Sequence, residues 1–146
     1  KVGIIVLDID GLKYVNDTLG HQEGDRVLTT AAERLTNWQR PEDLVARIGG
    51  DEFVIMVPDL PLQAMLEQQV STLASELFEE LSDPLVQTGK GIQASLGFAV
   101  YPDHASNMDA LLHVADQAMY VAKGRGDNQY HLGPDLRADL GHRLAR

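Results

Sequence analysis

Apolar and polar positions alternate with two different periods along the chain, and these periods predict strands and helices in turn. Residues 2–7 form a continuous apolar run that is partly β-branched, which is typical of a buried central strand. Residues 44–48 and 53–57 are two short apolar runs joined by a Gly-Gly-Asp-Glu segment, which predicts a hairpin. Residues 92–100 place apolar side chains at every second position and therefore predict a half-buried strand.

Helical periodicity fills the intervals between these runs. Residues 24–38 and 62–81 carry apolar side chains at helical spacing, which predicts two amphipathic helices. Residues 106–122 open with a Ser-x-x-Asp capping box and predict a third helix. Residues 130–132 then predict an edge strand.

The order β-α-β-β-α-β is that of an α+β, ferredoxin-like fold, also seen in polymerase palm domains, here with an added C-terminal helix and edge strand. Strands one and three of this fold are antiparallel neighbours. The end of the first strand, with Asp8, should therefore lie beside the start of the third, with Asp51 and Glu52. We expect one domain over residues 1–132, and residues 133–146 as a linker or the start of a neighbouring segment.

Composition narrows the classes of function. The chain has 146 residues and no cysteine, which excludes disulfides and thiolate metal sites. No apolar run reaches the roughly 18 residues of a membrane span. The net charge of −10 argues against nucleic acid as a partner, because such partners need a basic surface. An acidic protein can still bind a polyphosphate through a divalent cation.

The converging acids point to that cation. Carboxylates held together repel each other unless a cation lies between them, and an all-oxygen set suits Mg²⁺ or Mn²⁺. Magnesium keeps waters and takes one or two carboxylates together with substrate phosphates, which would make a nucleotide the substrate. A solvated acidic turn is the alternative. Asp10 lies on the same side of the strand as Asp8, and we interpret it as a strand-end cap rather than an outer partner of the metal.

Several segments then show a resemblance to a known family. The sequence RIGGDEF at 47–53 resembles the signature of the GGDEF family of diguanylate cyclases. Residues 8–25, 94–104 and 115–128 resemble further conserved blocks of that family, in the same order. The resemblance covers about residues 2–132. It implies an enzyme that condenses two GTP into cyclic di-GMP and two pyrophosphates, working as a homodimer with Mg²⁺ or Mn²⁺.

The resemblance also implies roles for individual residues. The metal ligands would be Asp8, the Ile9 carbonyl and Asp51, and the catalytic acids would be Asp51 and Glu52. The substrate-binding residues would be Gly11, Leu12, Lys13, Asn16, His21, Asp25, Gly49, Gly50 and Lys123. Asn16 and Asp25 would read guanine, since a carboxylate can accept from the guanine N1 and N2 donors that adenine lacks. Lys13, Lys123 and the amides of a loop at residues 11–13 would meet the phosphates.

Two positions depart from the family pattern. Leu12 stands where phenylalanine is common. Asp127 stands where the family often has an arginine directed at phosphates, and Arg125, two residues earlier, is the candidate to replace it.

The Arg-x-x-Asp at 40–43 resembles the inhibitory site at which these enzymes bind their product, with Arg40 and Asp43 as its ligands. On chemistry alone the segment is an ordinary turn.

We expect a sensory or phosphodiesterase domain in the parent chain and a cytoplasmic location, with a membrane anchor elsewhere in the parent left open. The alternatives are a non-catalytic receptor for GTP or cyclic di-GMP, a cyclase with a different product, and an interaction module without nucleotide.

Overall fold

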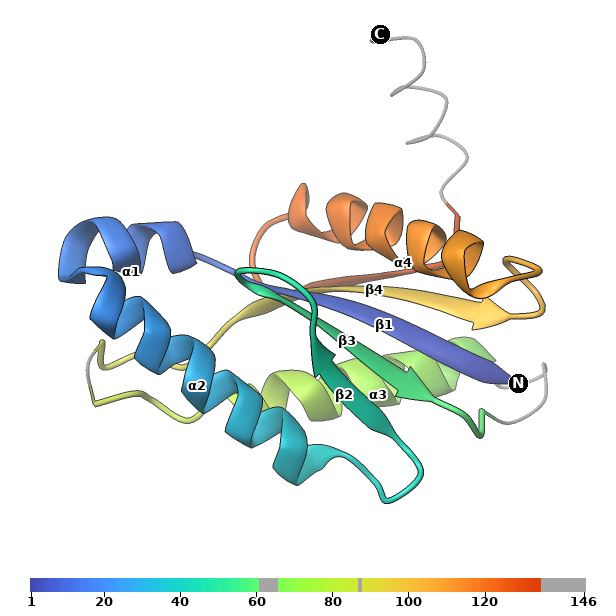
Figure 1. Cartoon of the computed structure of the whole chain (residues 1–146), viewed down its shortest axis with the longest axis horizontal. Helices are drawn as coiled ribbons and strands as arrows, with labels where there is room; N and C mark the ends of the chain where they lie inside the picture. Colours follow the sequence, from blue (N-terminus) through green and yellow to red (C-terminus); the bar gives the residue numbers. More distant parts are fainter. Residues whose placement is uncertain (61–65, 87, 135–146) are drawn as a thin grey trace, which may run out of the picture.

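The computed structural model describes residues 1–60, 66–86 and 88–134, which form a sheet covered by helices on both faces (Figure 1). The five strands are β1 (Val2–Ile9), β2 (Leu44–Arg47), β3 (Glu52–Val57), β4 (Ala94–Tyr101) and β5 (Gln129–Leu132). Their order across the sheet is β2-β3-β1-β4-β5. Neighbouring strands are antiparallel except for β4 and β5, which are parallel. The predicted α+β fold with antiparallel strands one and three is confirmed.

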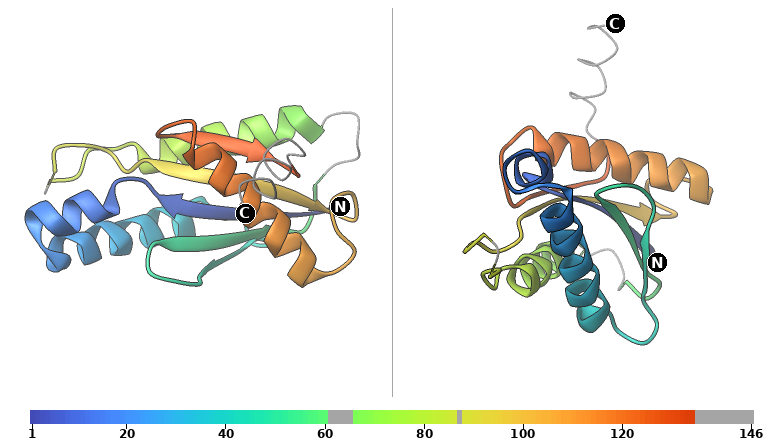
Figure 2. Two further views of the ribbon diagram at one scale, coloured as in Figure 1. Left: turned by 90° about the horizontal axis from the view of Figure 1, so that it is seen from above. Right: turned by 60° about the vertical axis from the view of Figure 1, so that its left-hand side comes forward.

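The four described helices are α1 (Leu12–Leu19), α2 (His21–Trp38), α3 (Leu66–Leu81) and α4 (Met108–Lys123). Helices α2 and α3 cover one face of the sheet and α4 covers the other, while α1 projects beyond the sheet's end (Figures 1 and 2). The larger core lies under α2 and α3 and contains Ile5, Leu35 and Leu77. A smaller core under α4 contains Ile4, Leu111 and Met119.

Strand β4 is buried on both faces, so the prediction of a half-buried strand was wrong. All of its residues except Tyr101 are buried, because α4 packs on one face and the larger core on the other. Gly97 allows α4 to approach closely, since a Cβ at this position would overlap the Ala115 carbonyl and the Met119 amide. Large apolar residues alternate with small residues such as Gly97 along β4. The small residues face α4 and not solvent, and for this reason the alternation did not mark a half-buried strand.

The boundaries of several elements also differ from the predictions. Helix α1 was not predicted, because it is only eight residues long and buries only Leu12. Helix α2 begins at His21, three residues earlier than expected. Helix α4 is capped by Asn107, whose side chain accepts a hydrogen bond from the Ala110 amide, and not by Ser106. The expected start of the helix at residues 62–81 lies outside the described residues.

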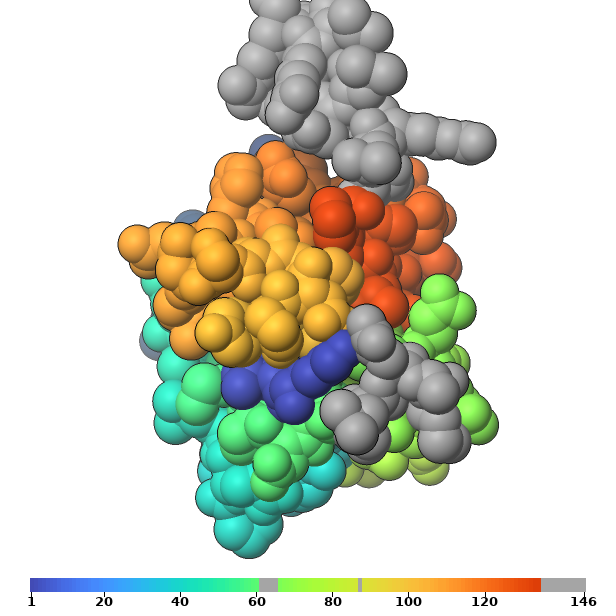
Figure 3. Space-filling view, turned by 90° about the vertical axis from the view of Figure 1, so that its right-hand side faces the viewer, coloured from blue at the N-terminus to red at the C-terminus, as the bar shows by residue number. Residues whose placement is uncertain are grey.

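The two ends of β1 have different surroundings. Its N-terminal end lies between the ends of β3 and β4 (Figure 3). Its C-terminal end leads through Gly11 into α1 and carries the acids of interest. None of the described helices is long and apolar enough to span a membrane.

Candidate active site

The C-terminal end of β1 and the hairpin between β2 and β3 meet at one place. Asp8 is paired directly with Glu52 in the antiparallel register. One step further, the Ile9 amide donates to the Asp51 carbonyl at 3.2 Å, which fixes the hairpin tip to β1. The predicted convergence of the strand-one acid and the hairpin acids is therefore confirmed in the geometry of the sheet.

The hairpin tip is ordered by a residue that the sequence analysis did not single out. The Arg47 guanidinium donates to the Gly49 carbonyl at 3.2 Å and to the Gly50 carbonyl at 2.7 Å. These two bonds tie the Arg47 side chain to the backbone of the turn. Gly49 and Gly50 are exposed, and a Cβ on either would meet no atom within 4 Å. The space over the tip is open, so a ligand could approach the backbone closely.

Asp8 is a buried carboxylate with one free oxygen. The residue is 4% exposed, and its Oδ2 accepts from the Lys123 Nζ at 2.6 Å. Its Oδ1 has no hydrogen-bond partner within the described residues. Burial raises the pKa of Asp8 to about 6, with Lys123 acting against the rise and the negative charge of Asp51 adding to it. A buried oxygen without a partner is the acceptor that a cation would satisfy.

Glu52 also has a raised pKa. Burial is the first cause, and the negative charges of Asp116 on α4 and of Asp51 add to it. Lys123 partly offsets these effects on Glu52. The carboxyl groups around the hairpin are thus held at some electrostatic cost, which is common where a site is built for chemistry rather than stability.

The donor set fits a magnesium ion that keeps waters. Over the described ranges, no group of three or more His, Cys, Asp or Glu side chains is arranged to hold a metal by itself. What the site offers is two carboxylates, Asp8 and Asp51, and nearby backbone carbonyls. Magnesium binds in this way, through one or two carboxylates plus water and substrate phosphates, and not in an all-protein cage.

Asp10 has a structural role here, as expected for a strand-end cap. Its carboxylate accepts from the Ser95 hydroxyl at 2.7 Å and from the Asn128 amide at 3.0 Å. The Asn128 side chain in turn accepts from the Ala94 amide at 3.0 Å. Asp10 therefore joins the ends of β1 and β4 to the segment that follows α4.

The expected phosphate loop at residues 11–13 is in fact a helix start. Gly11 has a positive φ of 71° and is the N-cap of α1, so Leu12 and Lys13 lie in the first turn. The Leu12 side chain is buried in the core, and Lys13 is exposed. Amides in the first turn of a helix have no partner inside the helix and favour anions, so this segment can still face phosphates with its backbone.

The polar residues expected to read guanine gather at the junction of α1 and α2. A Cβ on Gly24 would overlap the Asn16 side-chain oxygen, so the absence of a side chain at position 24 makes room for Asn16. Asp25 follows on the same turn and is exposed, as is His21 at the start of α2. This corner and the hairpin acids are both joined to the C-terminal end of β1, through α1 and through the sheet respectively.

Comparison with known proteins identifies the family. Residues 1–129 match the family model described as diguanylate cyclase, GGDEF domain. The chain belongs to the GGDEF diguanylate cyclase family. This confirms the resemblance noted from the sequence over nearly all of the predicted domain.

Named relatives of this GGDEF domain are signalling proteins of bacteria. The chain is 39% identical to diguanylate cyclase TpbB of Pseudomonas aeruginosa over 84% of its length, and 38% identical to the bifunctional diguanylate cyclase/cyclic di-GMP phosphodiesterase MucR of the same species over 89%. It spans 28% of TpbB and 18% of MucR.

A crystal structure of the GGDEF domain of DgcB from Caulobacter crescentus, in complex with c-di-GMP, superposes on this domain. Its TM-score is 0.74 and its identity 32%, with 90% of this chain and 77% of that chain covered. The fold described above is thus that of a solved GGDEF domain.

The Arg-x-x-Asp segment of this GGDEF domain is a closed pair. The Arg40 amide and Nε both donate to Asp43 Oδ2 at 3.1 Å, and Nη2 donates to Oδ1 at 3.4 Å. The Asp43 side chain is 0% exposed, whereas that of Arg40 is 46% exposed. Asp43 therefore orients Arg40, whose Nε also lies 3.7 Å from Glu42 Oε1 and whose side chain stays partly exposed.

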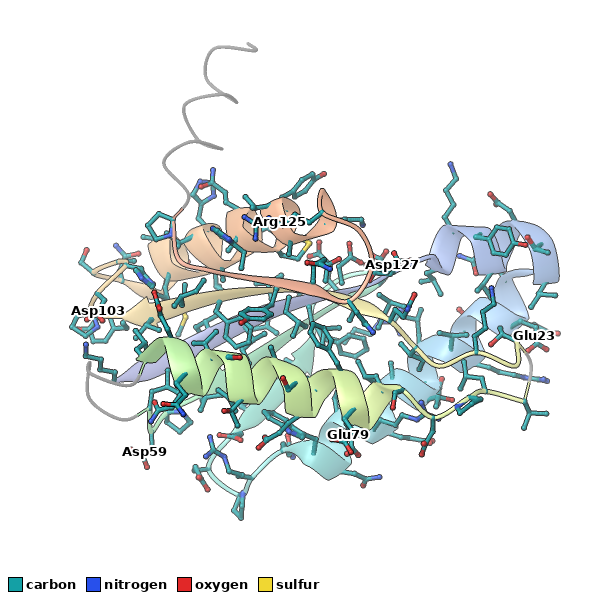
Figure 4. The ribbon with its side chains drawn as sticks, turned by 180° about the vertical axis from the view of Figure 1, so that it is seen from behind. Glu23, Asp59, Glu79, Asp103, Arg125 and Asp127 are labelled. Carbon is teal, nitrogen blue, oxygen red and sulfur yellow. The ribbon has the colours of Figure 1, made fainter. Side chains whose placement is uncertain are left out.

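Arg125 lies in the connection between α4 and β5, together with Asp127 (Figure 4). It lines a cleft of about 550 Å³ whose other walls come from α3 and β5. The residues of the cleft are Glu67, Val70, Phe78, Arg125, Asn128, Gln129, Tyr130, His131 and Leu132. None of the acids around the hairpin is among them. The part of Arg125 in phosphate binding remains a prediction.

Proposed function

We propose that this GGDEF domain is a diguanylate cyclase that condenses two GTP into cyclic di-GMP and two pyrophosphates. One observation carries the proposal: the buried Asp8 carboxylate has a free oxygen and lies against an acidic hairpin whose glycine tip is open. A domain that had lost catalysis would have no need to keep this costly arrangement of acids beside an open turn.

The residues available for GTP follow from the site. Asn16 and Asp25 would bind the guanine edge, with His21 beside them. Lys13, Lys123 and the first-turn amides of α1 would meet the triphosphate, and Arg125 would add to them if its connection turns toward the site. The metal would be held by Asp8, Asp51 and the Ile9 carbonyl, and when bound it would neutralise phosphate charge and acidify the attacking hydroxyl.

The protein's own groups complete the chemistry. The 3'-hydroxyl of one GTP attacks the α-phosphate of another, the new phosphoester bond forms, and pyrophosphate leaves. Glu52 or Asp51 takes the hydroxyl proton. Glu52 suits this role because burial raises its pKa, which makes it a stronger base than an ordinary carboxylate. Because each domain binds one GTP, two domains must face each other to form both bonds, and much of the rate comes from this alignment.

A second function is favoured by the Arg40–Asp43 pair. We propose that it binds cyclic di-GMP and inhibits the enzyme. An oriented and partly exposed guanidinium can form paired bonds to guanine or phosphate. If catalysis is absent, the same pair supports the alternative of a cyclic di-GMP receptor.

We further propose that the parent protein carries a sensory or phosphodiesterase domain and places this domain in the cytoplasm, where GTP is available.

The proposal is tested by incubating the purified chain with GTP and Mg²⁺ and separating the nucleotides by chromatography. We expect cyclic di-GMP and pyrophosphate in a ratio of one to two. A parallel reaction with EDTA should give neither product. Bound but unconverted GTP at high protein concentration would favour the receptor instead.

A further inference from the structure

Lys123 is the counterion of Asp8 in this domain. The Asp8 side chain is 6% exposed, and removing an anion from water to that extent is unfavourable unless a cation compensates it. The Lys123 ammonium supplies this compensation at 2.6 Å from Oδ2. The negative charges of Asp51 and Asp10 also act on the ammonium. The lysine therefore holds a position among acids where a divalent ion would be expected.

The Lys123 side chain is placed so that it can leave this position without disturbing the fold. It is the last residue of α4, and its side chain is 48% exposed. Its backbone is held independently, since its carbonyl accepts from the Gly126 amide at 3.3 Å. Among the contacts of the described residues, its Nζ makes one hydrogen bond, to Asp8. A flexible four-carbon stem lets such an ammonium turn outward at little cost.

We propose that Lys123 and a divalent cation exchange on Asp8: the ammonium neutralises the carboxylate in the nucleotide-free domain and moves to the triphosphate when the cation-bound nucleotide enters. This inference rests on the proposed function, because it takes GTP with a divalent ion as the ligand. It assigns Lys123 two successive partners, first a carboxylate and then a phosphate.

The exchange makes the binding of metal and nucleotide cooperative. A divalent ion that approaches the free Oδ1 comes close to the ammonium on Oδ2 and repels it. In the exchange, metal alone therefore drives the ammonium away and leaves it without a partner, so it binds weakly. Metal with GTP displaces the ammonium and also provides phosphate oxygens that receive it. Such coupling between two ligands is typically worth about 5- to 150-fold in affinity. The alternative is a permanent Asp8–Lys123 pair, in which the metal uses Oδ1 and Lys123 never moves.

The first test measures binding of Mn²⁺ alone to the nucleotide-free chain, from the electron paramagnetic resonance of the free ion. Lys123→Met removes the ammonium and keeps the apolar stem. Lys90→Met is the matched control, because it removes the same charge from an exposed position in the loop before β4. We expect Lys123→Met to bind Mn²⁺ about tenfold more tightly than the wild type, and GTP with Mn²⁺ about tenfold more weakly. Equal Mn²⁺ affinity in the two variants would overturn the exchange.

The second test uses the unaltered chain and does not depend on a variant that folds. Nitrogen-15 resonance of the lysine ammonium groups detects those protected from exchange with water. We expect Lys123 to be protected in the metal-free domain and to lose protection at saturating Mg²⁺ without nucleotide. The exposed Lys13 should not change. Protection of Lys123 that persists at saturating Mg²⁺ would show a permanent pair and refute the proposal.

Both tests are separate from the test of catalysis. If the wild type forms cyclic di-GMP but Lys123 stays on Asp8, the exchange is wrong and the proposed function stands. If the wild type forms no cyclic di-GMP but Mg²⁺ releases Lys123, the exchange on the metal stands and the proposed function fails.

Discussion

Asp8 and Glu52 are direct partners across the antiparallel strands β1 and β3. The pairing places a buried carboxyl and a half-buried one side by side at the end of the sheet, and both have raised pKa values. A sheet gains nothing from two acids in opposed positions, because like charges in cross-strand pairs are destabilising. The pairing therefore marks a position where the fold gives up stability to concentrate negative charge.

The first prediction concerns Asp51. Asp51→Ala should reduce cyclic di-GMP formation by a factor of at least about 10³, since it removes a proposed metal ligand. The fold should persist, because the contact of Asp51 with β1 is made by its backbone carbonyl. Without metal, the melting temperature should stay level or rise as repulsion with Asp8 is relieved. Asp59→Ala, an exposed acid at the far end of β3, is the control. Wild-type turnover in Asp51→Ala would remove the metal site from the mechanism.

The second prediction concerns the pH dependence of stability. The pKa of Asp8 rises from 3.8 to about 6 on folding. Between these values the unfolded chain releases the proton while the folded domain keeps it, so this residue's contribution to stability falls as pH rises from about 4 to 6. Asp8→Asn does not ionise. The free energy of unfolding of this variant, measured by urea titration, should rise relative to that of the wild type by about 1 to 2 kcal/mol between pH 4 and 7. This range is smaller than the full pKa shift implies, because water around the partly exposed Lys123 screens its charge. A constant difference over this range would contradict the assignment.

The third prediction concerns the choice of base. The wild type should prefer GTP to ATP by one to several orders of magnitude, because a site built for the guanine edge leaves its own groups unpaired with adenine. Asp25→Asn should lower this preference by about ten- to a hundredfold, as seen in competition between the two nucleotides. Asp17→Asn changes an exposed acid of α1 and should have no effect. Equal turnover of ATP by the wild type would make Asp25 an ordinary exposed residue of α2.

The fourth prediction concerns Arg40. Arg40→Ala should weaken the binding of cyclic di-GMP by about ten- to a hundredfold, the value of one paired arginine contact. Arg40→Lys keeps the charge and loses the planar fork, so it should also bind weakly. Calorimetry with cyclic di-GMP on the three proteins provides the measurement. If the wild type takes up no cyclic di-GMP, or the variants bind as well as it does, residues 40–43 are only a turn.

The fifth prediction concerns assembly. Because the proposed mechanism brings two GTP-loaded domains together, the rate per molecule should rise with protein concentration in dilute solution and then reach a plateau. Chromatography of the products over a hundredfold range of concentration gives the rate, and light scattering gives the oligomeric state. A constant rate per molecule from a monomer would contradict the two-domain mechanism.

The main lines of the fold and site could be predicted because they depend on long apolar patterns. The apolar run at the start of the chain and the hairpin pattern predicted the central strands. Because these strands are antiparallel neighbours, Asp8 could be expected beside Glu52. Helix α1 could not be found in this way, since it buries little and depends on Gly11 as its N-cap. The full burial of β4 could not be predicted from the strand's own pattern, because it depends on α4 packing over the second face. The ion pair of Asp8 with Lys123 joins residues 115 positions apart and has no local signal.

The bonds of Asp10 have a consequence for the order in which the domain is made. Asp10 is joined to Ser95 and to Asn128, 85 and 118 residues further along the chain. Contacts of such long sequence separation form late and slowly in folding. During synthesis, the Asp10 carboxylate lacks its bond to the Asn128 amide until that residue has left the ribosome. A nascent or truncated chain would therefore carry the complete hairpin signature before the bonds that tie β1 and β4 to the segment after α4 are complete.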